Sequence, residues 1–233
     1  MTSNPPDLVI LDEIPFTVDE KGLLEILKIK PGSRHAAELA DIFNEARTAA
    51  RPKAAFAVAP VDDKAADSIR IAGVGFTSRV LAVNLKDVNV AYPFIATCGQ
   101  ELEKWSSHMS GTLHSFWADT IKLLALGCAI GRLEAYLKER LGGAVLSSMN
   151  PGSLEDWPLA EQKPLFGIIG GAAEKIGVSL TGHMVLLPLK SVSGIYFISE
   201  ESFTNCRLCP RQHCNARRSP YEPALYTVRY GCG

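Results

Sequence analysis

Residues 113–141 carry the strongest constraint on the fold, because they predict one unusually long helix that is apolar around much of its circumference. Gly142 and Gly143 follow directly and end it. A helix of this kind has to lie centrally, with other elements packed around it. Its apolar positions recur at helical spacing and include Trp117, Ile121, Leu124, Cys128, Leu133 and Leu137.

Shorter strands and helices alternate irregularly along the rest of the chain. The residue pattern predicts strands over residues 7–14, 54–61, 68–74, 88–95, 180–189 and 192–199. It predicts helices over residues 19–27, 34–47, 102–109 and 159–176 and a short helix from Ser78, with residues 147–158 irregular. Such an order favours an α+β fold over a doubly wound parallel sheet.

Composition places the chain among globular proteins. Of its 233 residues, 47% are hydrophobic and 21% are charged, which is far from the composition of disordered chains. The N-terminus has no basic cluster before an apolar core, and no apolar stretch reaches the roughly 20 residues that span a bilayer. We therefore expect a cytoplasmic protein without a membrane partner. A formal net charge of -1 gives no global electrostatic reason to expect nucleic acid binding.

Three cysteines lie close together near the C-terminal end, as Cys206-x2-Cys209-x4-Cys214. Reduced thiols in a cytoplasmic protein favour a metal over disulfides. Two thiolates at x2 spacing can converge on one ion, and a third after another short loop joins them at little entropic cost. We expect a metal-binding tail over residues 204–233, after a first domain of residues 1–203.

The fourth ligand and the metal stay open on spacing alone. Cys232 is the nearest candidate, and Cys98, His213 or a small exogenous ligand could replace it. A zinc ribbon usually has two separated x2 pairs, whereas this chain has one. The plant-type ferredoxin order is x4 then x2, the reverse of the order here. Unligated surface thiols are the remaining interpretation.

Two segments resemble the reactivation domain of cobalamin-dependent methionine synthase. Residues 187–197, Leu-Pro-Leu-Lys-Ser-Val-Ser-Gly-Ile-Tyr-Phe, are similar to that family's Trp-Pro-x-x-Ser-Val-Ser-Gly-Trp-Tyr-Phe stretch. Pro151-Gly152 resembles the end of its Arg-Pro-Ala-Pro-Gly-Tyr loop. The two segments agree in order and spacing, and the resemblance covers roughly residues 80–200.

The resemblance implies a twisted antiparallel sheet among helices, in a domain that binds S-adenosylmethionine and presents its methyl group to oxidised cobalamin. Tyr196 matches the tyrosine that the family uses at its S-adenosylmethionine site. The family's arginine falls on Ser148 and its loop tyrosine on Ser153. The missing arginine removes the cation best suited to grip a carboxylate at two points, so binding of the methyl donor stays open.

The cofactor-binding residues implied by the resemblance are Tyr196, Ser193, Gly194, Pro151 and Gly152. A purely structural interpretation of residues 191–196 is equally consistent with the sequence. In that interpretation the segment is a sheet strand whose glycine allows close backbone packing and whose tyrosine is partly buried.

The chain lacks the Asp-x-His-x-x-Gly pattern with which many corrinoid proteins bind cobalt, so we expect it to act on the cobalamin of a separate protein. The predicted function is that of an accessory protein in reductive reactivation, which docks on a corrinoid methyltransferase and delivers an electron or a methyl group. An electron-transfer protein would be a further partner. Electron delivery favours an iron-sulfur cluster over zinc, because zinc carries no electron. Whether the chain is itself an enzyme stays open.

Four arginines surround the cysteines, with no acidic residue between positions 204 and 220. They could neutralise a thiolate-bound cluster or form a docking patch for an acidic partner. The alternative function is a zinc-binding module that contacts protein or nucleic acid through this basic tail; few aromatic residues there are placed for base stacking. The arginines are Arg207, Arg211, Arg217 and Arg218.

Overall fold

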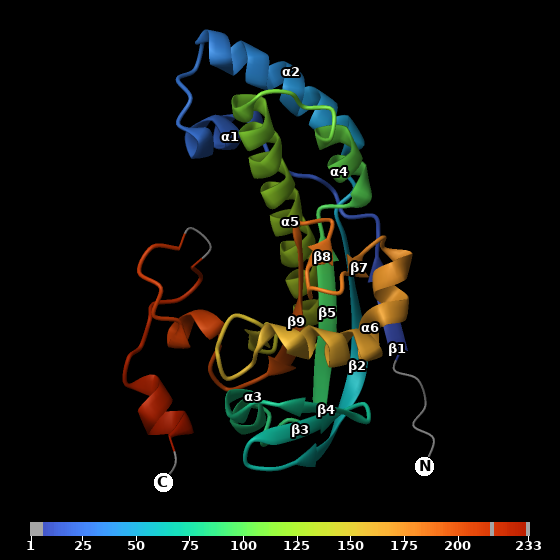
Figure 1. Ribbon diagram of the computed structural model, residues 1–233, viewed down its shortest axis with the longest axis vertical. Helices are drawn as coiled ribbons and strands as arrows, with labels where there is room; N and C mark the ends of the chain where they lie inside the picture. Colours follow the sequence, from blue (N-terminus) through green and yellow to red (C-terminus); the bar gives the residue numbers. More distant parts are fainter. Residues whose placement is uncertain (1–6, 215–216, 232–233) are drawn as a thin grey trace.

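A seven-stranded antiparallel sheet forms the centre of the computed structural model, which describes residues 7–214 and 217–231. The strands lie in the order β4-β3-β2-β5-β9-β6, and β1 pairs with the first half of β2 (Figure 1). The predicted α+β class with an antiparallel sheet and flanking helices is confirmed. The strands are β1 (Asp7–Leu11), β2 (Lys53–Lys64), β3 (Ser68–Ile71), β4 (Val74–Thr77), β5 (Val90–Thr97), β6 (Leu146–Met149) and β9 (Ser191–Ile198).

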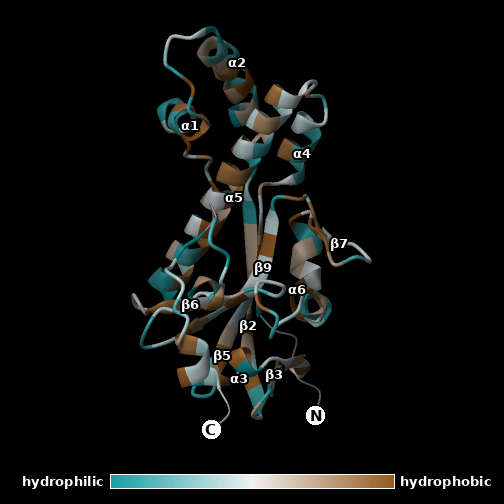
Figure 2. Cartoon of the chain, turned by 60° about the vertical axis from the view of Figure 1, so that its left-hand side comes forward, coloured by the Kyte–Doolittle hydropathy of each residue, from teal (hydrophilic) through white to brown (hydrophobic). Residues whose placement is uncertain are grey.

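The strand β5 is the centre of the sheet and is buried from its second residue to its last. It pairs with β2 on one side and with β9 on the other, so that Phe94 lies opposite both Phe56 and Gly194. In Figure 2 the hydrophobic colour follows the strands β2 and β5 between the helices. This arrangement explains why their sequences are nearly continuous apolar runs.

The described residues form six α-helices. They are α1 (Glu20–Leu27), α2 (Arg34–Ala49), α3 (Arg79–Asn84), α4 (Gln100–Ser106), α5 (Thr112–Arg140) and α6 (Gln162–Lys175). Side chains cap several of these helices, and the Ser78 hydroxyl accepts the Leu81 N–H at 3.0 Å at the start of α3. Three short turns are also helical, namely η1 (Leu159–Glu161), η2 (Asn205–Leu208) and η3 (Tyr226–Tyr230).

The long helix α5 is confirmed to within one residue at each end and joins two parts of the core. Its first half buries Trp117 and Ile121 among α1, α2 and α4. Its second half buries Leu133 and Leu137 against one face of the sheet (Figure 1). The helix is apolar around much of its circumference because each half has its own partners.

The other face of the sheet carries α3 and α6. Ile195 and Phe197 of β9 pack there with Leu165 and Ile169 of α6. Because side chains alternate along a strand, Tyr196 lies on the opposite face, with α5. The residues of β9 are therefore divided between two separate clusters.

Three expectations about local structure were wrong. Residues 68–74 were expected to form one strand, but β3 ends at Ile71 and β4 begins at Val74, and the two strands pair with each other. Residues 147–158 were expected to be irregular, yet they begin within the strand β6, which pairs with β9. Residues 180–189 were expected to form one strand but contain a small hairpin of two very short strands, β7 (Ser179–Leu180) and β8 (Leu186–Leu187). Met184 has a positive φ of 61° in the turn, which interrupts a continuous strand.

The C-terminal segment, described for residues 203–214 and 217–231, packs onto the sheet and α3. The Ser148 N–H donates to the Phe203 carbonyl at 2.9 Å, and Thr204 forms a parallel bridge with Ser148. Phe203, Leu208 and Tyr230 are buried in the same cluster as α6. Within the described ranges, no helix combines the length and the apolar character needed to cross a bilayer.

Candidate functional site

Tyr196 and Ser148 lie directly opposite each other on the neighbouring strands β9 and β6, on the face that packs against α5. The Tyr196 ring is almost completely buried and stacks on Phe94 with ring centroids 4.3 Å apart. Its hydroxyl donates a hydrogen bond of 2.8 Å to Oε1 of Glu134 on α5. The tyrosine that the sequence singled out is therefore held by both the sheet and the helix.

Arg218 of the C-terminal segment completes this group. One guanidinium nitrogen, Nη2, donates to the Ser148 hydroxyl at 2.9 Å, and Nη1 lies 3.2 Å from Glu134 Oε1. We call Ser148, Glu134, Tyr196 and Arg218 the Arg218 cluster. It brings together side chains from two strands, one helix and a distant loop.

The electrostatics of the cluster keep the phenol neutral. Burial and then the neighbouring Glu134 carboxylate raise the pKa of Tyr196 well above its usual range, so the hydroxyl remains a donor. The two charged side chains are 43% and 32% exposed for Arg218 and Glu134, so a small molecule can reach them. An adjacent guanidinium and carboxylate suit a ligand that carries both a carboxylate and an amine.

Two hydrogen bonds hold the start of the C-terminal segment beside the cluster. Asn205 donates to the Asn150 carbonyl at 2.9 Å, directly beyond β6. The Thr204 hydroxyl bonds to that of Ser219 at 3.1 Å, which ties the neighbour of Arg218 to the bridge at Ser148. Arg218 is thus positioned by contacts on both sides of the loop that contains the cysteines.

Two of the other arginines in this segment bind partners chiefly within the segment itself. Arg207 forms a two-point ion pair with Glu222, with distances of 2.5 and 3.0 Å. Arg217 donates to the carbonyls of Cys206 at 3.1 Å and Cys209 at 3.2 Å, and to that of Arg211. These arginines organise the loop. The proposed docking role of the basic residues stays a prediction.

The three clustered cysteines are free thiols and partly exposed. Cys206 Sγ accepts the backbone N–H of Arg218 at 3.4 Å. In the part of the chain that the structure describes, no group of three His, Cys, Asp or Glu residues is arranged to hold a metal ion. Cys232 lies outside the described residues. The donor types suit a soft metal, but the described thiols do not converge on one point.

Cys98 does not join the cysteines of the C-terminal segment. It is fully buried at the end of β5, in the cluster that contains Leu102 and Trp117. Burial, reinforced by Glu103, raises the pKa of the Cys98 thiol to about 12. It therefore stays protonated, whereas His213, the other substitute ligand, is exposed in the cysteine loop itself.

Ser193 and Gly194 have packing roles in the structure. The Ser193 hydroxyl lies on the face away from Tyr196 and donates to Gln162 Oε1 of α6 at 3.1 Å. A Cβ on Gly194 would lie 2.4 Å from the Met149 carbonyl oxygen and 2.5 Å from Asn150 Nδ2. The close backbone packing expected for this glycine is present; a ligand role for either residue stays a prediction.

Pro151 and Gly152 form the turn after β6. Gly152 has a positive φ of 79°, and its N–H donates to the Trp157 carbonyl at 2.8 Å. A Cβ there would meet the Leu159 side chain at 2.8 Å, so glycine is required on two counts. Pro151 is buried. This turn fixes the end of β6 and hence the position of Ser148.

Glu134 and the site role of Arg218 were missed by sequence reasoning. Glu134 lies within the helix α5, of which only the apolar positions were considered. Arg218 was considered only as one of four basic residues. Glu134 directly follows the buried Leu133 in the sequence, so a helical wheel would have placed it beside the apolar face. The sequence carries no signal that brings Arg218 to β6, because that contact depends on the path of the loop.

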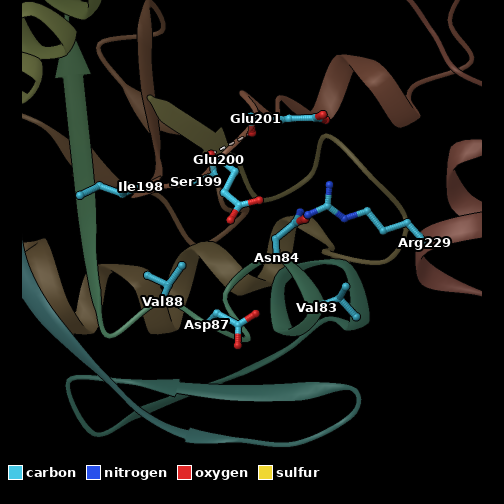
Figure 3. Close-up of a pocket in the computed structure, with 9 residues that line it drawn as sticks. All are labelled: Val83, Asn84, Asp87, Val88, Ile198, Ser199, Glu200, Glu201 and Arg229. Atoms are coloured by element: carbon cyan, nitrogen blue, oxygen red, sulfur yellow. Dashed lines mark hydrogen bonds between the residues drawn. The ribbon is translucent and has the colours of Figure 1, made fainter. Parts of the chain in front are cut away.

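A separate open pocket of about 530 Å³ lies between the end of α3, the end of β9 and η3 (Figure 3). It contains none of the residues that sequence reasoning selected. Asp87, Glu200 and Glu201 line it, against the single cation Arg229. Its excess of carboxylates disfavours an anionic ligand, which makes the Arg218 cluster the better candidate for one.

The architecture is an α+β fold in which helices flank an antiparallel sheet. Among solved structures, the chain is similar to the crystal structure of the MetH reactivation domain bound to AdoHcy, with a TM-score of 0.57. The similarity covers 84% of this chain and 79% of that chain at 12% sequence identity, which establishes the fold alone. No family model matches the chain, and no curated protein matches it.

Proposed function

We propose that this protein binds an S-adenosyl ligand at the Arg218 cluster and takes part in the reactivation of a corrinoid carried by a separate protein. The observation that supports this proposal most strongly is that a guanidinium, a carboxylate and a buried tyrosine meet on one face of β9 and β6. The shared fold supports this setting, since the similar structure holds AdoHcy. Tyr196 is also the residue that the resemblance assigns to such a site.

The chemistry of the cluster fits the amino-acid end of S-adenosylmethionine or S-adenosylhomocysteine. The guanidinium of Arg218 offers paired donors for a carboxylate, and the carboxylate of Glu134 offers an acceptor for an ammonium group. Both side chains are partly exposed, so the ligand can replace the contact that they make with each other. When bound, S-adenosylmethionine would supply a methyl group.

Calorimetric titration of the full chain with S-adenosylhomocysteine and S-adenosylmethionine tests this proposal. Saturable binding is expected, and Glu134→Gln should weaken it about tenfold because the ammonium loses its charged partner. Glu200→Gln, in the acidic pocket, is the matched control and should bind like the unmodified protein. Absence of binding to the unmodified protein would overturn the proposal.

We further propose that Cys206, Cys209 and Cys214 bind an iron-sulfur cluster, with Cys232 as the fourth ligand. The support is the donor set and the backbone N–H of Arg218 on Cys206 Sγ, since such hydrogen bonds tune the potential of thiolate-bound clusters. Such a cluster would supply single electrons.

Metal and sulfide analysis after anoxic purification tests the cluster. A brown protein with absorption near about 400 nm is expected. A colourless protein with stoichiometric zinc would contradict it and favour the zinc-binding module instead. Cys206→Ser should lower the iron content, whereas Cys128→Ser, in a partly buried thiol of α5, should leave it unchanged.

The expected partner is a corrinoid-binding protein or a corrinoid-dependent methyltransferase. A partner loaded with cob(II)alamin is mixed with this chain, a reductant and S-adenosylmethionine. The cob(II)alamin should be converted to methylcobalamin, and the absorption spectrum of the mixture measures this conversion. The same mixture without the chain is the control. An unchanged cob(II)alamin spectrum in the complete mixture would argue against a role in reactivation.

A further inference from the structure

The C-terminal segment brings a guanidinium to the strand position where the resemblance places an arginine. Position 148 is a buried serine. Its side chain is short and carries no positive charge. Arg218 Nη2 lies 2.9 Å from that hydroxyl, although the two residues are 70 positions apart in the chain. The positive charge at this point of the sheet is therefore present but comes from another segment.

The guanidinium is oriented towards the site and has N–H donors left for a ligand. Nη1 contacts Glu134 and Nη2 contacts Ser148, the guanidinium also interacts with the Tyr196 hydroxyl, and the side chain is 43% exposed. Arginine has more N–H donors than these contacts use. A carboxylate entering beside Glu134 can accept a pair of parallel hydrogen bonds from it.

Within the described part of the C-terminal segment, the other arginines near the cysteines are placed differently. Arg207 is bound to Glu222 at two points. Arg217 is surrounded by backbone carbonyls of its own loop. The Arg211 side chain is exposed. Arg218 alone among these four contacts both β6 and α5.

The position of Arg218 is fixed by its neighbours in the loop. Its backbone N–H donates to Cys206 Sγ at 3.4 Å, and the adjacent Ser219 hydroxyl bonds to Thr204 at 3.1 Å. Thr204 in turn forms the bridge with Ser148. These contacts therefore attach the loop that carries the guanidinium to β6, the strand that contains Ser148.

From these contacts we infer that Arg218 is the specificity-determining residue that binds the carboxylate of the ligand, in place of an arginine at position 148. This inference rests on the proposed function, since it names the group that recognises the amino-acid end of an S-adenosyl ligand. Glu134 and Ser148 hold the guanidinium until the carboxylate arrives. The C-terminal segment is then a part of the binding site.

The test compares two probes that differ in the amino-acid group. S-adenosylhomocysteine carries the carboxylate, whereas 5′-methylthioadenosine has the adenosine and sulfur but lacks the amino-acid group. Arg218→Ala should weaken binding of the first probe about 10- to 100-fold and leave binding of the second nearly unchanged. Arg211→Ala is the matched control and should change neither.

A rescue variant separates recognition from folding. Ser148→Arg in the Arg218→Ala background places a guanidinium at the vacated point from the strand itself and should restore the preference for S-adenosylhomocysteine. An equal loss of affinity for both probes in Arg218→Ala, or unchanged binding of both, would overturn the inference. Failure of the unmodified protein to bind either probe would instead overturn the proposed function.

Discussion

The hydroxyl of Tyr196 and the carboxylate of Glu134 lie 2.8 Å apart and join the sheet to the helix α5. Tyr196→Phe keeps the ring stacked on Phe94 but removes the donor, so we expect a loss of about 1 kcal/mol in the free energy of unfolding. Urea denaturation measures this loss. Tyr136→Phe, in the same helix, should change the stability by less than about 0.5 kcal/mol. Equal effects of the two changes would contradict a structural role for the Tyr196–Glu134 hydrogen bond.

Gly194→Ala should destabilise the sheet. The new Cβ would lie 2.4 Å from the Met149 carbonyl oxygen, so the backbone of β6 or β9 has to move. Overpacking of this kind costs about 1–3 kcal/mol, which chemical denaturation can measure. Gly75→Ala is the matched control, because a Cβ on this strand glycine meets nothing within 4 Å. A stability of Gly194→Ala equal to that of the control would refute the close contact.

Tyr230 anchors the far end of the C-terminal segment. Its ring is fully buried beside Phe203, and its hydroxyl donates to Asn84 Oδ1 at 2.8 Å. Tyr230→Ala should cost about 3–5 kcal/mol, as for other large aromatic truncations, while Tyr230→Phe should cost about 1 kcal/mol. Thermal and urea unfolding test both. If Tyr230→Ala were as stable as the unmodified protein, the segment would not be part of the core.

The ion pair between Arg207 and Glu222 should make the attachment of this segment sensitive to acid. Hydrogen bonding to Arg207 holds the pKa of Glu222 below its usual range. Its contribution is therefore fully present above the unfolded pKa and is lost as pH falls through the lower folded value. Hydrogen exchange of residues 203–214, corrected for intrinsic rates, should lose protection as the pH falls from neutral to below the usual pKa of a glutamate.

The control for this pH effect is Glu222→Gln, which should remove most of the acid dependence while lowering protection at neutral pH. Arg34 and Glu38, an exposed pair within α2, offer a second comparison. Glu38→Gln should leave the C-terminal segment unaffected. A pH profile that is the same with and without Glu222 would contradict the role of this ion pair.

Cys98 should react far more slowly with thiol reagents than the cysteines of the C-terminal segment. It is fully buried, and its pKa is raised to about 12 chiefly by burial. In the folded protein stripped of any bound metal, alkylation followed by mass spectrometry should label Cys206, Cys209 and Cys214 first. Unfolding in denaturant should then release Cys98. Rapid labelling of Cys98 in the native protein would show that the cluster formed by α1, α2, α4 and the first half of α5 opens.

Much of the fold could be predicted because its elements have strong local signals. The periodicity of α5 predicts its ends to within one residue, and the Ser-Val-Ser-Gly-x-Tyr-Phe stretch predicts a strand with Tyr196 buried. The short strand β6 was missed because its four residues, with two serines, have a weak strand pattern and depend on pairing with β9. Tertiary pairing decided that segment.

The candidate site could be predicted only in part. Tyr196 emerged from the resemblance, but its partners Glu134 and Arg218 come from a helix and a loop that no local pattern connects. Ser193, close to Tyr196 in the chain, faces the opposite side of the sheet. Sequence distance is a poor guide here because alternation along a strand separates neighbours, while loops unite distant residues.

The pairing of β5 with β9 has a consequence for synthesis on the ribosome. Phe94 lies opposite Gly194, so the second partner of the central strand is made long after β5 itself. Until β9 emerges, one edge of β5 has no native partner, and its apolar residues are open to association with other chains. Nascent chains that stall after α5 should therefore be the ones that depend most on chaperones.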